Sequence, residues 1–208
     1  MVTRVLRVVA SALALALMLV LVLVLAARGD RSSGATSPFT STDITGVGWG
    51  RDFHLTDHNG VPRSLADFKG KAVMLFFGYI HCPDICPTTL ADMAAVVKQL
   101  GADGERVQGL FVTVDPRRDT PQVLVQFVPA FHPRFLGLYA DEGTTAALAK
   151  DFKIYYNSAQ PANAQGNYTV DHSVGVFVFD PRGRLRLLVA GPRKVAAMAA
   201  DVALLLKE

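Results

Sequence analysis

The chain has 208 residues, of which 50% are hydrophobic and 19% are charged, so its length suits one domain with an appended segment. This composition predicts a substantial hydrophobic core and excludes global disorder. The net charge of +3 comes from scattered basic residues without the basic and aromatic clusters of nucleic-acid-binding proteins, so we expect no nucleic-acid partner.

The first feature along the chain is an apolar run, residues 8–27, in which Ser11 is the sole polar side chain. About 20 residues at ~1.5 Å rise cover the ~30 Å hydrocarbon layer of a bilayer, which predicts a transmembrane anchor. A cleaved signal peptide is the alternative, although its apolar region usually has about 7–15 residues. Arg4 and Arg7 favour a cytoplasmic location for residues 1–7. The rest of the chain would then lie on the extracytoplasmic, periplasmic side of the cytoplasmic membrane.

Residues 28–50 are small and polar and show no hydrophobic period. Such a composition is typical of a flexible linker. Trp49, the single tryptophan, marks the expected start of packing. The folded domain is therefore predicted over residues 51–208.

The predicted domain alternates between short apolar runs and segments of helical periodicity. The tight-turn pair Asn59-Gly60 predicts a small hairpin at its start. Residues 71–78 and 110–114 are continuous apolar runs of strand length, which predicts strands buried on both faces of a sheet. Met74 and Met93 are interpreted as core residues.

Helices and further strands complete the prediction. Helices are expected over 87–100, 120–131, 144–152 and 192–207, and strands over 135–139, 174–179 and 185–189. Thr120 is the expected N-cap of the second helix, because Pro121 suits the first helical position. The order of elements predicts an α/β, thioredoxin-like fold with an N-terminal hairpin extension, in which a parallel strand pair is joined by a helix.

Cys82 and Cys86 are the two cysteines of the chain. A proline clashes with the preceding turn inside a helix, so Pro87 predicts that the helix begins there, with Cys86 at or beside its N-cap. The positive end of the helix dipole would favour the thiolate form. Thiolates bind soft metals and also exchange disulfides, so the spacing of the two cysteines leaves both chemistries open.

His172 is the candidate third ligand, because it directly precedes the strand predicted over 174–179. In a thioredoxin-like fold this loop approaches the start of the helix that carries the cysteines. Two thiolates and an imidazole suit copper, as Cu(I) or Cu(II), and zinc is the chemical alternative. A hydrogen-bonded loop role is the other interpretation of His172. His54, His58 and His132 are expected at surface turns or helix ends, and His81 is expected to point away from Cys82.

The motifs around these residues resemble the Sco/SenC family of membrane-anchored copper-binding proteins. The resemblance rests on Cys82-Pro-Asp-Ile-Cys-Pro-Thr-Thr-Leu90, Val114-Asp-Pro-Arg-Arg-Asp-Thr-Pro121, Val170-Asp-His-Ser173 and the segments 57–60 and 65–70. It implies Cys82, Cys86 and His172 as copper ligands. It also implies delivery of copper to, or preparation of, the binuclear copper site of cytochrome c oxidase subunit II.

The second of these motifs holds Asp115 and Asp119, whose carboxylates could fix the loop by accepting backbone N–H groups. A partner-docking role is the alternative for both residues. Neither aspartate belongs to the predicted ligand set.

Two functions follow from the sequence. The first is a copper metallochaperone, and the alternative is a thiol–disulfide oxidoreductase that reduces the acceptor's cysteines through Cys82 and Cys86. In the second function His172 would only tune the acidity of the thiols. A peroxidase is a weaker interpretation, because no Thr-x-x-Cys arrangement precedes the helix. Whether the protein is an enzyme is therefore left open at this point.

Overall fold

The computed structural model describes residues 15–20, 37–157, 168–191 and 194–208. The chain divides into two units, Met1–Pro38 and Phe39–Glu208. In the first unit, residues 15–20 are helical, and the rest of the anchor predicted over 8–27 lies outside the described residues. Within the described ranges, no helix is long and apolar enough to cross a bilayer.

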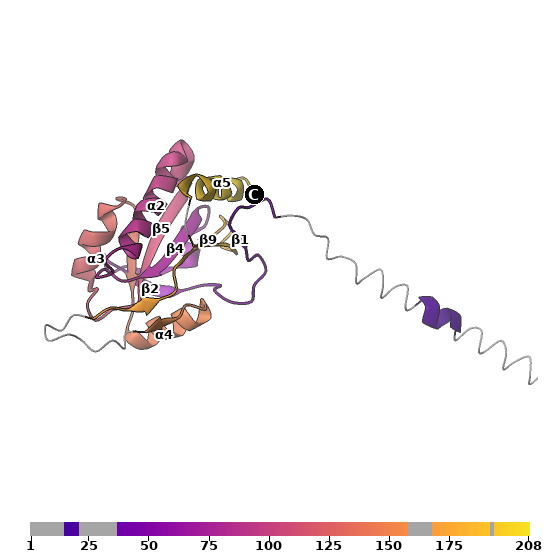
Figure 1. Ribbon diagram of the computed structural model, residues 1–208, viewed down its shortest axis with the longest axis horizontal. Coiled ribbons are helices and arrows are strands. Elements are labelled where there is room, and N and C mark those ends of the chain that lie inside the picture. Colours follow the sequence, from indigo (N-terminus) through magenta and orange to yellow (C-terminus); the bar gives the residue numbers. More distant parts are fainter. Residues whose placement is uncertain (1–14, 21–36, 158–167, 192–193) are drawn as a thin grey trace, which may run out of the picture. The chain divides into compact units, whose positions relative to one another are not determined.

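The second unit is an α/β domain (Figure 1). Its strands are β1 (Thr42–Asp43), β2 (His54–Asp57), β3 (Pro62–Ser64), β4 (Ala72–Gly78), β5 (Val107–Thr113), β6 (Leu136–Tyr139), β7 (Tyr156–Asn157), β8 (Asp171–His172), β9 (Gly175–Phe179) and β10 (Leu185–Ala190). Its helices are η1 (Leu65–Phe68), α2 (Ile85–Gln99), η2 (Gly101–Arg106), α3 (Pro121–Phe127), η3 (Val128–Ala130), α4 (Glu142–Asp151) and α5 (Val195–Leu205).

Eight of these strands form one sheet in the order β1-β10-β9-β4-β5-β6-β2-β3. The central strands β4, β5 and β6 are parallel, and β9 joins β4 in the antiparallel direction. This arrangement confirms the predicted thioredoxin-like order, with the hairpin β2–β3 added beside β6. The strand β1 at the opposite edge was not predicted.

Strand β4 is buried along its whole length, because helices cover both faces of the sheet: α2 and α5 lie on one side and α4 on the other (Figure 1). Successive side chains of a strand point to opposite faces. The ring of Phe76 accordingly packs against Phe111, and the ring of Phe77 packs against Phe152 and Phe177. Met74 and Met93 are fully buried, as predicted.

The start of the domain lies earlier than the sequence predicts. Residues 39–50, assigned above to the linker of residues 28–50, belong to the second unit. The buried carboxylate of Asp201 accepts the backbone N–H groups of Thr40 and Ser41, each at 2.8 Å. Trp49 packs edge-on against Phe177. These long-range contacts offset the weak local preference of a small, polar segment, so the segment packs.

His58 also differs from its prediction as a surface residue. It is 8% exposed, and its Nδ1 accepts the backbone N–H of Gly137 in β6 at 3.0 Å. The backbone N–H of His58 donates to the carbonyl of Gly137 at 2.9 Å. The backbone and the imidazole of His58 together therefore continue the pairing of the hairpin with β6 beyond the end of β2.

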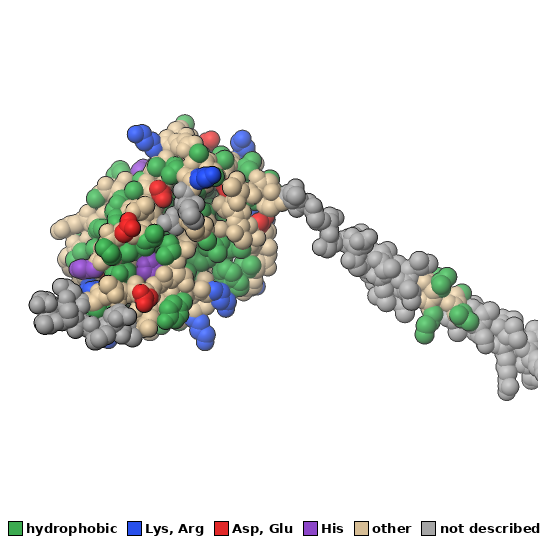
Figure 2. Space-filling model, in the orientation of Figure 1, with side chains coloured by type: hydrophobic (Ala, Val, Ile, Leu, Met, Phe, Trp, Pro, Cys, Tyr) green, Lys and Arg blue, Asp and Glu red, His purple; other side chains and the backbone are tan. Residues whose placement is uncertain are grey.

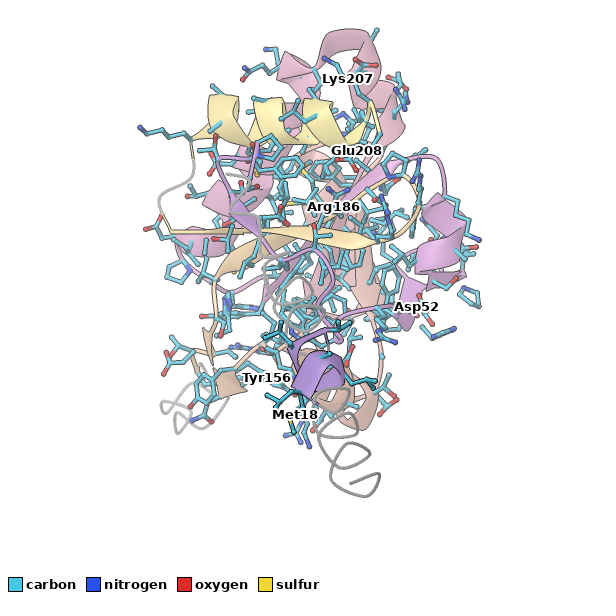
Figure 3. The ribbon with its side chains drawn as sticks, turned by 90° about the vertical axis from the view of Figure 1, so that its right-hand side faces the viewer. Met18, Asp52, Tyr156, Arg186, Lys207 and Glu208 are labelled. Carbon is cyan, nitrogen blue, oxygen red and sulfur yellow. The ribbon has the colours of Figure 1, made fainter. Side chains whose placement is uncertain are left out.

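Charged side chains are distributed rather than concentrated on the domain. On the face shown in Figure 2, lysine and arginine side chains lie apart from one another instead of forming one basic patch. Some pair internally: the guanidinium of Arg186, in β10, forms ion pairs with Asp180 and Glu208 (Figure 3). Arg186 is thus neutralised by two carboxylates within the domain.

Candidate copper and dithiol site

The two cysteines lie where the chain leaves β4 and enters α2. The backbone N–H of Val114 donates to the carbonyl of Gly78 at 2.9 Å, so the loops that follow the parallel strands β4 and β5 leave the sheet together. Helix α2 begins at Ile85 with Asp84 as N-cap, two residues before the predicted start at Pro87. Proline is accepted there, because a first-turn N–H has no intrahelical partner to lose.

Cys86 is therefore the second residue of α2, and its side chain is fully buried. Burial raises the pKa of the Cys86 thiol, the backbone N–H of Tyr79 lowers it, and the neighbouring Cys82 and Asp119 raise it further. The prediction that the helix terminus favours a thiolate is wrong for Cys86, because the loss of hydration outweighs the helix dipole. Burial thus favours the neutral thiol of Cys86, and a metal ion bound by Cys82, Cys86 and His172 would take the place of that proton.

His172 lies on β8, which pairs with β7 so that His172 opposes Tyr156. Its Nδ1 lies 3.0 Å from the carbonyl oxygen of Ser173. A carbonyl can only accept a hydrogen bond, so Nδ1 carries the proton and Nε2 presents a lone pair. That lone pair faces Sγ of Cys86 at 3.3 Å, which is the orientation that a metal-binding histidine requires.

Two aromatic rings hold the imidazole of His172 edge-on. The ring centroid of Phe76 lies 6.2 Å away and that of Tyr79 lies 5.7 Å away. Burial lowers the pKa of His172, while the carbonyl of Ser173 and the charge of Asp171 raise it. Neutral imidazole, the form that binds metals, is therefore favoured.

The structure brings Cys82, Cys86 and His172 together. Their ligand atoms all lie within 4.8 Å of one another. Metal–ligand bonds of about 2.0–2.3 Å place such atoms ~4 Å apart, so small shifts suffice to enclose one ion. Of the described histidines, only His172 joins this cluster. His81 instead lies 3.9 Å from the carboxylate of Asp119.

Asp119 fixes the loop between β5 and α3, as the sequence predicts. Its Oδ2 accepts the Thr113 hydroxyl at 2.6 Å and the backbone N–H of Ile80 at 3.1 Å. These two bonds join the ends of β4 and β5 beneath the cysteine loop. Burial raises the pKa of Asp119 above its ordinary value, since Oδ1 is buried and has no hydrogen-bond partner within the described part of the chain.

Three residues beside the site were missed by sequence reasoning: Tyr79, Arg118 and Tyr168. The guanidinium of Arg118 lies 3.5 Å from the ring centroid of Tyr168 and 5.8 Å from that of Tyr79. Asp115 accepts hydrogen bonds from both Arg118 and Tyr168, rather than from backbone groups as predicted. Local patterns carry no signal for these contacts, because Tyr168 lies 50 residues from Arg118 along the chain.

The chemistry available at the site follows from its donors. Both thiols are free, and their sulfur atoms lie within 4.8 Å of each other, so the pair can bind a metal or form a disulfide. Two sulfur atoms and one imidazole nitrogen suit Cu(I) through the soft thiolates and Cu(II) through the mixed set. Zinc accepts the same ligands with a fourth one added. Copper therefore fits the residues present.

Comparison with known proteins points in the same direction. Residues 43–207 match the family model described as SCO1/SenC. The chain is 44% identical over 139 residues to the mitochondrial protein SCO2 homolog of Homo sapiens, a match that covers 66% of this chain and 52% of that protein. The chain thus spans about half the length of the curated relatives it matches.

Solved structures share the fold as well. Bradyrhizobium japonicum ScoI with copper bound is 34% identical with a TM-score of 0.66, and the match covers 73% of this chain and 96% of that one. Apo Sco1 from Thermus thermophilus is 38% identical with a TM-score of 0.69, and the match covers 82% and 98% of the two chains. The similarity thus extends to a protein that binds copper.

Proposed function

The chain belongs to the SCO1/SenC family, and on this basis we propose that it is a copper metallochaperone that binds one copper ion through Cys82, Cys86 and His172. The observation that carries the proposal is the convergence of two sulfur atoms and one imidazole nitrogen within 4.8 Å. Cys86 and His172 come from segments 86 residues apart. The Nε2 lone pair of His172 faces the sulfur of Cys86 rather than a backbone partner.

The copper acceptor in this proposal is the binuclear copper site of cytochrome c oxidase subunit II. Residues 8–27 anchor the chain in the cytoplasmic membrane, and the domain lies on the periplasmic side. The apolar run supports this part of the proposal, because its length matches the bilayer. A tethered donor beside a membrane-bound acceptor gains effective concentration without new contacts.

Copper titration of the reduced full-length chain in detergent tests the binding step. We expect one Cu(I) per chain, and mixing with the copper-free soluble domain of subunit II should move copper to that domain. Absence of stoichiometric Cu(I) binding would refute the metallochaperone function. Binding without transfer would refute the choice of acceptor.

Thiol–disulfide exchange with the same acceptor is the second candidate function. The contact between the two free thiols favours it, because such a pair can close to a disulfide while it reduces an acceptor disulfide. The reduced chain would then convert the oxidised acceptor to its dithiol form in the absence of copper. Mass spectrometry of alkylated acceptor thiols measures this reaction, and an acceptor that stays oxidised would exclude it.

A further inference from the structure

We infer that Arg118 is a positioning residue for copper binding, which holds the segment that carries His172 over the two cysteines. The inference rests on the proposed copper-binding function and adds a residue outside the ligand set. Its basis is a group of four side chains, Asp115, Arg118, Tyr168 and Tyr79, named here the Arg118 cluster.

Arg118 contacts the histidine-bearing segment in two ways. Its Nη1 donates to the backbone carbonyl of Tyr168 at 2.8 Å, and the guanidinium stacks on the Tyr168 ring with 3.5 Å between its central carbon and the ring centroid. The Nη2 atom is buried and has no hydrogen-bond partner in the described part of the chain. The guanidinium of Arg118 is therefore held mainly against the face of the Tyr168 ring. A planar guanidinium stacks on such a face better than an ammonium group does.

Asp115 closes the cluster. It forms a buried ion pair with Arg118 and accepts the hydroxyl of Tyr168 at 2.7 Å. The side chains of Arg118 and Asp115 are 17% and 3% exposed, so water screens this pair only weakly. A buried cation that has both its charge partner and its aromatic neighbour in place is costly to displace. The cluster thus fixes Tyr168, four positions before His172, against the loop that follows β5.

Tyr79 connects the cluster to the ligand itself. Its ring contacts the guanidinium of Arg118 and, at 5.7 Å, the imidazole of His172. Its hydroxyl is hydrogen-bonded to the backbone of Val170, and its main-chain N–H donates to the sulfur of Cys86. Displacement of Arg118 would therefore loosen both the segment before His172 and the ring against which the imidazole packs.

The other attachment of His172 is limited. Strand β8 has two residues, and its strand partner among the described residues is the two-residue β7. Ser173 adds a backbone bond to Tyr155 at 2.8 Å and a side-chain bond at 3.1 Å. These contacts fix one end of the short segment from Tyr168 to Ser173, and the Arg118 cluster fixes the other. Both ends must be held for Nε2 to keep its place beside Cys86.

Competition titration of Cu(I) with the full-length reduced chain tests the inference. Arg118→Met is expected to weaken Cu(I) binding by about 10- to 100-fold, the range found for residues that orient a metal ligand. In the His172→Ala background the same substitution should change the affinity by less than about 2-fold, because the ligand that Arg118 positions is gone. X-ray absorption of the copper-loaded Arg118→Met variant should show a weaker imidazole signal than the wild type.

Three further variants distinguish a loss of His172 positioning from a general loss of folded protein. Arg118→Lys retains the charge without the planar stacking and should stay weakened. Tyr168→Phe loses only the hydroxyl bond to Asp115, which corresponds to a loss of roughly 2- to 10-fold. Arg117→Gln is the matched control, because its side chain is 74% exposed and pairs with Glu142, and it should bind as the wild type does.

Wild-type affinity in both Arg118→Met and Tyr168→Phe would overturn the inference. So would full recovery in Arg118→Lys, which would assign the effect to charge, or an equal loss in the His172→Ala background. Each of these outcomes leaves wild-type copper binding intact. Failure of the wild type to bind Cu(I) refutes the proposed function instead, so the two failures are distinguishable.

Discussion

On the cysteine side of the site, Cys86 is held by the core of the domain, whereas the histidine side is held by a two-residue strand and the Arg118 cluster. Cys86, the second residue of α2, is 0% exposed. Its sulfur lies against Gly78 at the end of β4. His172 is half-buried, and β8 lies outside the main sheet. The two sides thus differ in how much structure must move to displace a ligand.

This difference bears on how copper could be exchanged. Moving Cys86 would disturb packed groups of the core, which costs free energy throughout the domain. Moving His172 requires loss of a few hydrogen bonds and ring contacts at the surface. We therefore expect the imidazole to leave first when an acceptor replaces the ligands, with the sulfur atoms releasing copper last.

Cys86→Ser should have the largest effect on Cu(I) binding, because it removes one of the two soft ligands and lies on the more rigid side of the site. A hydroxyl is a poor ligand for Cu(I), and we expect the affinity to fall by roughly 1,000-fold, or ~4 kcal/mol. The variant should also lose all dithiol–disulfide cycling. Competition titration and thiol alkylation measure the two losses. Retained Cu(I) affinity would show that Cys86 is not a ligand.

His172→Ala removes the ligand on the histidine side and leaves both cysteines in place. We expect Cu(I) affinity to fall by about 100-fold, or ~3 kcal/mol, because two thiolates remain. The midpoint potential of the dithiol should move by less than about 30 mV, which corresponds to ~1.4 kcal/mol for a two-electron couple. Redox titration checks the potential. His81→Ala is the matched control beside Cys82, and equal affinities in the two variants would rule out ligation by His172.

Gly78→Ala tests how rigid the cysteine side is. A Cβ at this position would lie 2.9 Å from Sγ of Cys86 and 2.8 Å from a ring carbon of Phe111. Overpacking of this kind costs about 1–3 kcal/mol, and we expect the free energy of unfolding in urea to fall by that amount. Gly48→Ala is the control, since its Cβ would meet only the end of Arg51 at 3.7 Å. Unchanged stability in Gly78→Ala would show that the cysteine side can yield.

Most of the fold was predictable because apolar period and turn chemistry are local. The continuous apolar runs became β4 and β5, and the strands predicted over 174–179 and 185–189 became β9 and β10. Helix α3 begins after Thr120, although Pro129 follows and the end of the predicted helix becomes the short helix η3. These features need no knowledge of distant contacts.

The site was predictable only in part. Spacing and resemblance pointed to Cys82, Cys86 and His172, and the structure brings them together. Burial depth is a property of the packed molecule, so neither the raised pKa of Cys86 nor the Arg118–Tyr168 stacking could be inferred from local patterns. The same limit explains why His58, which follows a strand and precedes a tight turn, was assigned to the surface.

His58 provides the last test, because it is buried in the hairpin region rather than in either side of the site. Burial lowers the pKa of His58, and the charge of Asp57 raises it in part. A depressed pKa in the folded state means that the unfolded chain takes up the proton first. His58 therefore contributes stability that is present above its ordinary pKa near 6.5 and is lost as the pH falls below that value.

We expect His58→Asn to be less stable than the wild type at pH 7.5 but to lose less stability on going to pH 5.5. The wild type should lose more stability than His58→Asn between the two pH values, because the pKa of His58 is lower in the folded state than in the unfolded state. Urea unfolding at the two pH values measures it. His172→Ala serves as the comparison, because burial lowers the pKa of His172 too. If His58→Asn keeps the full pH dependence while His172→Ala removes it, the acid sensitivity belongs to the histidine side of the site and not to the hairpin.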